Sequence, residues 1–210
     1  MDRRGFLKHT GNITLLSIAA FSFGCSIQPM VKSSERIALI YGTRYGATED
    51  TASWIARGIG TQVDVLNIET LDFKEIVYYD KVIIGSGIWI DGPHKRLMEL
   101  LQMKKEQIEA KLIASFIVCG TTGDDEAGRS RIESYFERFH KPLAIEPLLR
   151  RHFGGRMIIE KLSDKDRKLL SNFYKKVLKR EFVSWDRTDR EKAEQFGVEL
   201  QTELSTEAII

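Results

Sequence analysis

The sequence predicts an α/β fold, a three-layer sandwich in which a five-stranded parallel sheet of strand order 2-1-3-4-5 lies between helices. Apolar, strand-like runs alternate with helical patterns from residue 36 to residue 206. The central runs, Val82–Ile84 and Leu112–Val118, are nearly continuous apolar stretches, typical of strands that are buried on both faces of a parallel sheet. Because parallel strands need right-handed crossovers, the helical segments are expected to connect the strands across the two faces of the sheet.

Each element has its own signal, taken in chain order. The expected strands are Arg36–Gly42, Gln62–Ile68, Lys81–Ile88, Leu112–Gly120 and His152–Ile159. The expected helices are Ala47–Gly60, Asp72–Tyr79, His94–Ala110, Glu126–His140, Asp164–Lys179 and Asp186–Leu204. The apolar run Ile37–Ile40 indicates the first strand, and the acids of residues 124–126 suit the first turn of the fourth helix. Residues 168–180 are amphipathic at helical spacing, and Trp185 and Asp186 are expected to open the final helix.

The loop between the first strand and the first helix has the layout of an anion cradle. Its expected binding residues are Thr43, Arg44, Tyr45, Gly46, Ala47 and Thr48. Backbone N–H groups and the positive end of the helix dipole favour an anion at this position. No Lys-Ser/Thr pair closes the loop and no G-x-G-x-x-G motif is present, so nucleoside-triphosphatase and dinucleotide loops are excluded. The alternative is an ordinary turn with a Thr-rich helix cap.

Two further loops should meet the first at the carboxyl edge of the sheet. The expected binding residues are Ser86, Gly87, Ile88 and Trp89 after the third strand, and Gly120, Thr121, Thr122 and Gly123 after the fourth. Trp89 suits stacking on a flat ring, the alternative being a core aromatic that covers the sheet edge. The later loop contains no aromatic residue, so one face of a bound ring is expected to be open. His94 is given no chemical role, and Cys119 is expected to be a small buried side chain.

The spacing of Thr43, Gly46 and Thr48 resembles the FMN-phosphate loop of flavodoxins. Residues 36–204 are similar to the flavodoxin-domain group that includes the menaquinone-dependent protoporphyrinogen oxidases. Further likeness lies in His152–Met157 and Ser184–Asp186. The resemblance implies a flavodoxin-like fold, FMN as the cofactor and electron transfer as the task. For the oxidases, the resemblance implies an extended insertion before the final helix. The sequence shows no clear equivalent of this insertion.

The N-terminus is expected to be an export signal. Residues 1–24 combine Arg3-Arg4-x-Phe6-Leu7-Lys8, a close match to the twin-arginine motif, with an apolar stretch too short to span a bilayer comfortably. Residues 25–35 then form a tether to a domain over residues 36–206. Cys25 is expected to be a lipidation site, and ordinary cleavage after Gly24 fits equally well. The predicted location is extracytoplasmic, with a membrane surface within reach of a lipid anchor.

Charge and cysteine content exclude several other classes. The chain has a net charge of +2, and without its first 24 residues it holds 29 basic and 29 acidic side chains (32 − 3 and 30 − 1). Such a balance gives no field that would attract nucleic acid. The two cysteines build no disulfide framework, and no metal site is expected. No acidic residue ends the third strand at residues 85–87, which excludes a receiver domain.

Three functions remain open. In the first, an exported FMN protein passes electrons between a membrane, quinone-linked donor and an extracytoplasmic acceptor. In the second, the chain is a flavin-dependent oxidase or reductase of a specific substrate, similar to the protoporphyrinogen oxidases. In the third, it is a binding module without flavin. No catalytic acid, base or nucleophile stands out. The basic residues 150–152 are expected to be solvated, and residues 168–180 are expected to form a helix packed on the sheet.

Overall fold

A computed structural model describes residues 35–60, 63–90 and 92–207. The predicted signal peptide over residues 1–24 and the predicted lipidation site Cys25 lie outside the described residues. In the part of the chain that is described, no helix combines the length and the apolar character needed to cross a bilayer.

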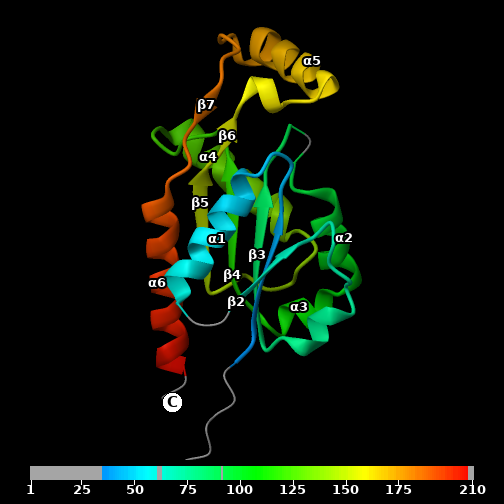
Figure 1. The fold of residues 1–210 in the computed structure, drawn as a ribbon, viewed down its shortest axis with the longest axis vertical. Coiled ribbons are helices and arrows are strands. Elements are labelled where there is room, and N and C mark those ends of the chain that lie inside the picture. The colour runs from blue at the N-terminus through cyan, green and yellow to red at the C-terminus, as the bar shows by residue number, and fades with distance from the viewer. Residues whose placement is uncertain (1–34, 61–62, 91, 208–210) are drawn as a thin grey trace, which may run out of the picture. The chain divides into compact units, whose positions relative to one another are not determined.

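Five parallel strands form the central sheet in the order β2-β1-β3-β4-β5, which confirms the predicted topology. The strands are β1 (Ile37–Gly42), β2 (Val63–Asn67), β3 (Lys81–Gly87), β4 (Leu112–Cys119) and β5 (Leu149–Gly154). The order reverses between β1 and β3, which is where a sheet of this kind opens a crevice at its carboxyl edge. In Figure 1 the carboxyl ends of the strands point towards β6, β7 and α5.

Helices cover both faces of the sheet. One face carries α1 (Ala47–Ile59) and α6 (Arg190–Glu207). The other face carries η1 (Glu75–Tyr78), α2 (Lys95–Met103), α3 (Lys105–Glu109) and α4 (Glu126–His140). Side chains of β1 alternate between the two cores, with Leu39 packing towards α1 and α6, and Ile40 towards α2 and α4. Every residue of β1 is buried, as a central strand of a parallel sheet requires.

Glycines allow α1 and α6 to approach each other closely. A Cβ atom on Gly58 would lie 2.0 Å from the carbonyl oxygen of Glu194, and one on Gly197 would lie 2.2 Å from that of Ile55. No side chain fits in such a space, so the backbones of the two helices pack directly against each other. This contact holds α6 against the sheet.

The predicted bounds of the fifth strand and the final helix were wrong. The strand covers Leu149–Gly154 and not His152–Ile159, because this edge strand exposes two arginines and lacks an apolar run. The final helix begins at Arg190 and not at Asp186, and Asp189 caps it by accepting a hydrogen bond from Lys192 N (3.0 Å).

Two other helix predictions were also too long. The segment His94–Ala110 is divided at Lys104 into α2 and α3. The segment Asp72–Tyr79 forms only the short 3₁₀ helix η1. The predicted helix Glu126–His140 is confirmed as α4, and Asp125 caps it by accepting a hydrogen bond from Gly128 N (2.7 Å).

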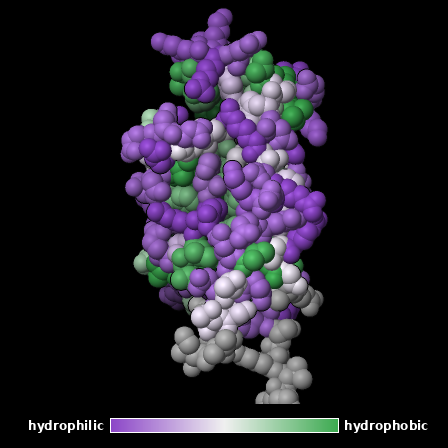
Figure 2. Space-filling view, turned by 90° about the vertical axis from the view of Figure 1, so that its left-hand side faces the viewer, coloured by the Kyte–Doolittle hydropathy of each residue, from purple (hydrophilic) through white to green (hydrophobic). Residues whose placement is uncertain are grey.

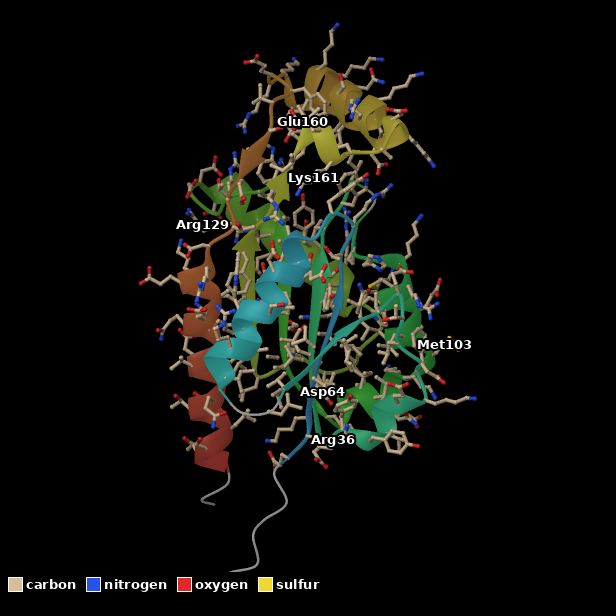
Figure 3. All side chains as sticks on the ribbon, viewed as in Figure 1. Arg36, Asp64, Met103, Arg129, Glu160 and Lys161 are labelled. Carbon is tan, nitrogen blue, oxygen red and sulfur yellow. The ribbon has the colours of Figure 1, made fainter. Side chains whose placement is uncertain are left out.

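A separate lobe, residues 155–189, lies between β5 and α6. It contains β6 (Arg156–Met157), η2 (Ile159–Lys161), α5 (Asp164–Phe173), the π-helix η3 (Tyr174–Leu178) and β7 (Trp185–Asp186). β6 and β7 pair in antiparallel fashion, so the two ends of the lobe lie side by side. Figure 3 shows Glu160 and Lys161 in this lobe, at the end of the domain opposite to Arg36 and Asp64.

The lobe corrects three expectations. The chain does carry an excursion before its final helix, although the sequence showed no clear equivalent of one. The amphipathic residues 168–180 do not pack on the sheet, because the lobe has its own small core, formed by Met157, Leu162 and Leu170 with aromatic neighbours. The final helix is also not opened by Trp185 and Asp186, which form β7 instead.

Candidate functional site

A cleft of about 1320 Å³ lies where the loops after β1, β3 and β4 meet the lobe. Eleven of the predicted binding residues line this cleft: Thr43, Arg44, Tyr45, Ala47, Thr48, Gly87, Ile88, Trp89, Gly120, Thr121 and Thr122. Gly46, Ser86 and Gly123 are not among its lining residues. The topology therefore brings the three predicted loops to one site, and the lobe adds a wall that the sequence did not predict.

The loop after β1 turns sharply into α1 at Gly46. Gly46 has φ 88°, a left-handed conformation that glycine adopts without strain, and its N–H donates to Thr43 Oγ1 (3.0 Å). The next N–H groups, at Ala47, Thr48 and Glu49, form the first turn of α1 and have no carbonyl partner within that helix. Together with the helix dipole they make the positive end of α1 a site for an anion.

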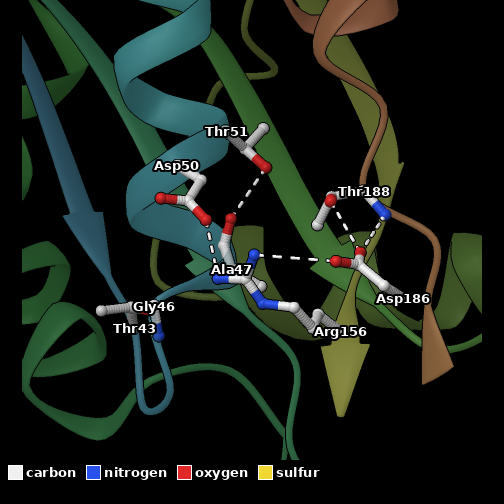
Figure 4. A network of polar contacts seen from close by, with 8 residues as sticks. All are labelled: Thr43, Gly46, Ala47, Asp50, Thr51, Arg156, Asp186 and Thr188. Carbon is white, nitrogen blue, oxygen red and sulfur yellow. Dashed lines mark hydrogen bonds and ion pairs between the residues drawn. The ribbon is translucent and has the colours of Figure 1, made fainter. Parts of the chain in front are cut away.

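Arg156 pairs with Asp50, one of the two acidic residues in the first turn of α1. Its Nη2 lies 2.6 Å from Asp50 Oδ2 in α1, and its Nη1 lies 3.7 Å from Asp186 Oδ2 in β7 (Figure 4). Asp186 Oδ1 also accepts hydrogen bonds from Thr188 N (2.9 Å) and Oγ1 (2.7 Å). Burial alone would raise the pKa of Asp186, but these hydrogen bonds and the Arg156 charge outweigh it and lower the pKa.

The side chains of Arg44 and Tyr45 are bound to the lobe. Arg44 donates to both carboxylate oxygens of Asp166, from Nε (2.9 Å) and Nη2 (2.6 Å), and the Tyr45 hydroxyl donates to the same carboxylate. Ser163 N in turn donates to the Tyr45 hydroxyl (3.2 Å). Burial would raise the pKa of Asp166, but the hydrogen bond from Tyr45 and the charge of Arg44 lower it overall. Asp166 is therefore a buried carboxylate that joins α5 to the loop after β1.

The loop after β3 places Trp89 against those same two side chains. The Arg44 guanidinium lies 4.6 Å from the Trp89 ring centroid, and the Tyr45 and Trp89 ring centroids are 5.7 Å apart. Trp89 thus packs with part of the lobe core while also lining the cleft. Ser86 is fully buried, and its hydroxyl donates to Gly87 O (3.0 Å) and accepts from His94 N (2.9 Å). Its visible role is to hold this loop.

His94 is a lining residue that sequence reasoning left without a role. Its Nε2 lies 3.3 Å from Glu69 Oε1. Burial lowers the pKa of His94, although the Glu69 carboxylate acts in the opposite direction. A Cβ on Gly42 would lie 2.6 Å from the His94 side chain, so the imidazole packs directly on the end of β1. In the sequence, His94 directly follows Pro93, and this position indicated only the start of a helix.

The loop after β4 is covered by an aromatic side chain from the lobe. A Cβ on Gly120 would lie 2.8 Å from the Trp185 ring, and Arg187 Nη1 donates to Gly120 O (2.5 Å). Trp185 Nε1 donates to the Tyr174 hydroxyl (2.7 Å), which fixes the indole in the cleft wall. The sequence expectation of an open side rested on this loop alone, and Trp185, from a distant part of the chain, lies against the loop at Gly120.

The α4 side of the cleft is basic. Arg131, Ser134, Tyr135 and Arg138 recur at helical spacing on one side of α4, and Arg180 joins them from the lobe. The guanidinium groups of these three arginines have no acidic partner among the described residues. Free guanidinium groups bind carboxylates and phosphates through paired hydrogen bonds. This wall can therefore receive an acidic group of a ligand.

The residues present fit an aromatic cofactor that carries a phosphate. The first turn of α1 supplies the anion site, and Trp89 and Trp185 supply aromatic surfaces on neighbouring loops. Trp89 Nε1 and His94 Nδ1 are buried and have no hydrogen-bond partner among the described residues. Buried polar atoms are normally paired, so these two suit contact with a ligand. The described residues contain no cluster of three or more His, Cys, Asp and Glu side chains placed to hold a metal.

Cys119 ends β4 at the cleft and is buried, as the sequence predicted. Burial raises the pKa of its thiol, which keeps the group protonated near neutral pH. It is therefore a poor nucleophile.

The chain is similar to several known proteins. The chain is 25% identical over 104 residues to Protoporphyrinogen IX dehydrogenase (quinone) of Escherichia coli strain K12, an alignment that covers 48% of this chain and 58% of the relative. The fold of this chain is similar to that of a WrbA-like flavodoxin from Agrobacterium tumefaciens, with a TM-score of 0.50 at 13% identity. The match covers 82% of this chain and 99% of the flavodoxin. An archaeal flavodoxin also matches, with a TM-score of 0.44 at 16% identity, over 81% and 99% of the two chains.

The structural neighbours are too distant in sequence to show more than the fold. The family assignment comes from the sequence itself, since residues 38–183 match the flavodoxin domain and include the loops after β1, β3 and β4. With its five-stranded sheet of order 2-1-3-4-5 and helices on both faces, the chain belongs to the flavodoxin domain family.

Proposed function

We propose that the chain binds FMN in the cleft and works as an electron-transferring flavoprotein. The observation that carries this proposal is the convergence of an anion site at the start of α1 with two aromatic side chains, Trp89 and Trp185, in one cleft. Membership of the flavodoxin domain family supports FMN as the ligand. When bound, FMN supplies the capacity to accept and donate electrons, which no side chain of the site offers.

The chain's own residues would bind and orient the cofactor. The N–H groups of the first turn of α1 and the hydroxyls of Thr43 and Thr48 receive the phosphate. Arg156 neutralises Asp50, so that this carboxylate does not repel the phosphate. Trp89 and Trp185 supply the apolar surfaces that the ring system needs, and the lobe limits the access of water to that part of the cleft.

The partners we propose are a quinone-linked donor in the membrane and an acceptor outside the cytoplasm. The sequence supports this through the twin-arginine pattern at Arg3 and Arg4 and the apolar residues behind it. Twin-arginine export carries folded proteins, which suits a protein that must take up its cofactor before it crosses the membrane. The name of the Escherichia coli relative includes a quinone, although the chain spans only 58% of that relative's length.

A second candidate is a flavin-dependent oxidoreductase that acts on an organic acid. The cleft, at about 1320 Å³, exceeds the roughly 300–1,000 Å³ typical of small-molecule sites, so it has room for a second ligand beside FMN. The unpaired Arg131, Arg138 and Arg180 would hold its acidic groups. Turnover of protoporphyrinogen IX with a soluble quinone, lost in Arg131→Ala/Arg138→Ala while FMN is retained, would favour this candidate over the electron carrier.

The first experiment is an absorbance and fluorescence titration of the purified full chain with FMN. Thr43→Ala removes the hydroxyl that accepts from Gly46 N, and it should weaken FMN binding about tenfold, the value of one hydrogen bond to a charged ligand. Thr70→Ala is the matched control, because the Thr70 hydroxyl serves only the turn after β2. A folded protein that retains no flavin bands would refute both redox functions and leave a binding module.

A further inference from the structure

The outer side of the lobe carries an unusual concentration of positive charge. Five lysines, Lys165, Lys168, Lys175, Lys176 and Lys179, are exposed and have no acidic partner among the described residues. We call them the basic face. The only acid between residues 165 and 180 is Asp166, which is buried and bound to Arg44 and Tyr45. By contrast, the described residues as a whole hold 28 basic and 28 acidic side chains, after removal of Arg3, Arg4, Lys8, Lys32, Asp2 and Asp91 from the totals of 32 and 30.

Two apolar side chains project between these lysines. Leu169 in α5 is 45% exposed and Val177 in η3 is 63% exposed. The opposite side of the same helix packs inward, where Leu170 and Tyr174 join the small core of the lobe. Nitrogen-tipped side chains extend outward from α5 in Figure 3, and green and purple residues alternate over the lobe at the top of Figure 2. The helix is therefore apolar on its buried side, whereas its exposed side is basic and carries two apolar side chains.

The backbone at the end of this helix is strained. η3 is a π-helix, and Lys179 has φ 51° and ψ 41°, the only non-glycine residue with positive φ in the part of the chain described. Such conformations cost free energy and persist mainly where a function uses them. Val177 and two lysines, Lys175 and Lys176, lie in this widened turn and are exposed.

We propose that the basic face of the lobe, with Leu169 and Val177, docks on the surface of an anionic lipid bilayer. A helix with clustered lysines and a few exposed apolar side chains binds such a surface through charge and shallow insertion. A protein partner fits less well, because lysine is depleted in the cores of protein interfaces, where arginine and aromatic residues are enriched. The five cations of the basic face are lysines, whose compact charges suit diffuse contact with headgroups, and the exposed Arg167 of α5 is paired with Asp164.

Docking in this way would bring the cleft to the bilayer. Leu170, Phe173, Tyr174 and Leu178 line the cleft from the same helical segment that carries the basic face. A lipid-soluble electron carrier would then reach the cleft without crossing bulk water. This consequence rests on the proposed electron transfer, whereas the docking itself does not.

The test is flotation of the full chain, loaded with FMN, with vesicles of phosphatidylcholine alone or with added phosphatidylglycerol. Lys175→Gln/Lys176→Gln is compared with Lys74→Gln/Lys141→Gln, which removes the same charge from exposed positions outside the lobe. Each lysine near an anionic surface contributes about a fivefold gain in binding, so the first variant should lose on the order of 25-fold and the control little. The N-terminal apolar residues contribute equally to all three proteins.

Three results would overturn the proposal. The first is equal binding to neutral and anionic vesicles, and the second is an equal loss in both double variants, which would indicate net charge only. The third is retention on an immobilised acidic polypeptide, lost in Lys175→Gln/Lys176→Gln, without any vesicle binding, which would make the partner a protein. Neither Lys175 nor Lys176 lines the cleft, so FMN retention in both variants separates a failure of docking from a failure of the proposed function.

Discussion

Replacing Asp166 by asparagine tests how the lobe is attached to the loop after β1. The Asp166 side chain is 3% exposed and accepts two hydrogen bonds from Arg44 and one from Tyr45. Asparagine has nearly the same shape, but it lacks the negative charge and has only one acceptor oxygen. At least one of the donors therefore loses its partner. Because these bonds join residues more than 120 positions apart in the chain, their loss should act on the lobe as a unit.

The expected cost is about 2 kcal/mol of lobe stability. Removing one partner of a fully buried ion pair costs about 3–5 kcal/mol. The Arg44 side chain is 44% exposed, so water compensates part of its loss, and the amide oxygen of asparagine keeps one hydrogen bond. Since about 1.4 kcal/mol corresponds to a factor of ten, the lobe should open roughly 30 times more often.

Hydrogen exchange followed by mass spectrometry measures this directly. In Asp166→Asn, amides of residues 155–189 should exchange roughly 30-fold faster, while those of β1, β3 and β4 keep their rates. Asp164→Asn is the matched control, because the Asp164 side chain is fully exposed in the same helix. Unchanged exchange in the lobe would refute the attachment, and equal acceleration in lobe and sheet would refute the idea that the lobe opens separately.

Two further predictions concern the stability of the domain. Gly197→Ala should lower the free energy of unfolding by about 1–3 kcal/mol in urea titrations, because the added methyl would lie 2.2 Å from the Ile55 carbonyl oxygen. Gly123→Ala is the control and should cost clearly less, because its methyl meets nothing nearer than 3.5 Å. Equal costs would contradict the close packing of α1 and α6. Burial lowers the pKa of His140, although Glu146 acts in the opposite direction. The stability that the neutral, buried His140 contributes is therefore present above about pH 6.5, and it is lost as the pH falls below that value. Unfolding free energies at pH 8 and pH 5.5 should therefore differ less in His140→Gln than in the unaltered chain, and an unchanged difference would argue against this role.

The order of the elements could be predicted because central parallel strands leave a strong signal. β3 and β4 are buried on both faces, so their sequences are nearly continuous apolar runs. β5 lies at the edge of the sheet, and its exposed Arg150 and Arg151 interrupt the run, which moved the predicted strand towards the apolar residues of the lobe. The bounds of α4 were predicted because Asp125 provides a local cap signal.

The loops of the site could be predicted from topology, but the lobe's part in it could not. Parallel strands bring the ends of β1, β3 and β4 to one edge, whatever the loops contain. Asp166 looked like an ordinary acid in the first turn of a helix, and only the folded chain shows it bound to Arg44 and Tyr45. In the same way, no local pattern places Trp185 against Gly120. Such pairings depend on how the lobe folds back, which sequence periodicity does not encode.

The lobe and the anion site are physically joined, so binding of an anion would be linked to the position of the lobe. The lobe is held to the rest of the domain by Arg187 on the Gly120 carbonyl oxygen, by Arg156 on Asp50, and by Asp166 on Arg44 and Tyr45. The last two attachments end on the loop after β1 or on the first turn of α1. An anion that orders this loop therefore also orders the points that hold the lobe, and a lobe held in place favours the anion by the same free energy. A surface that binds the lobe from outside would act on the loop after β1 through these same two attachments.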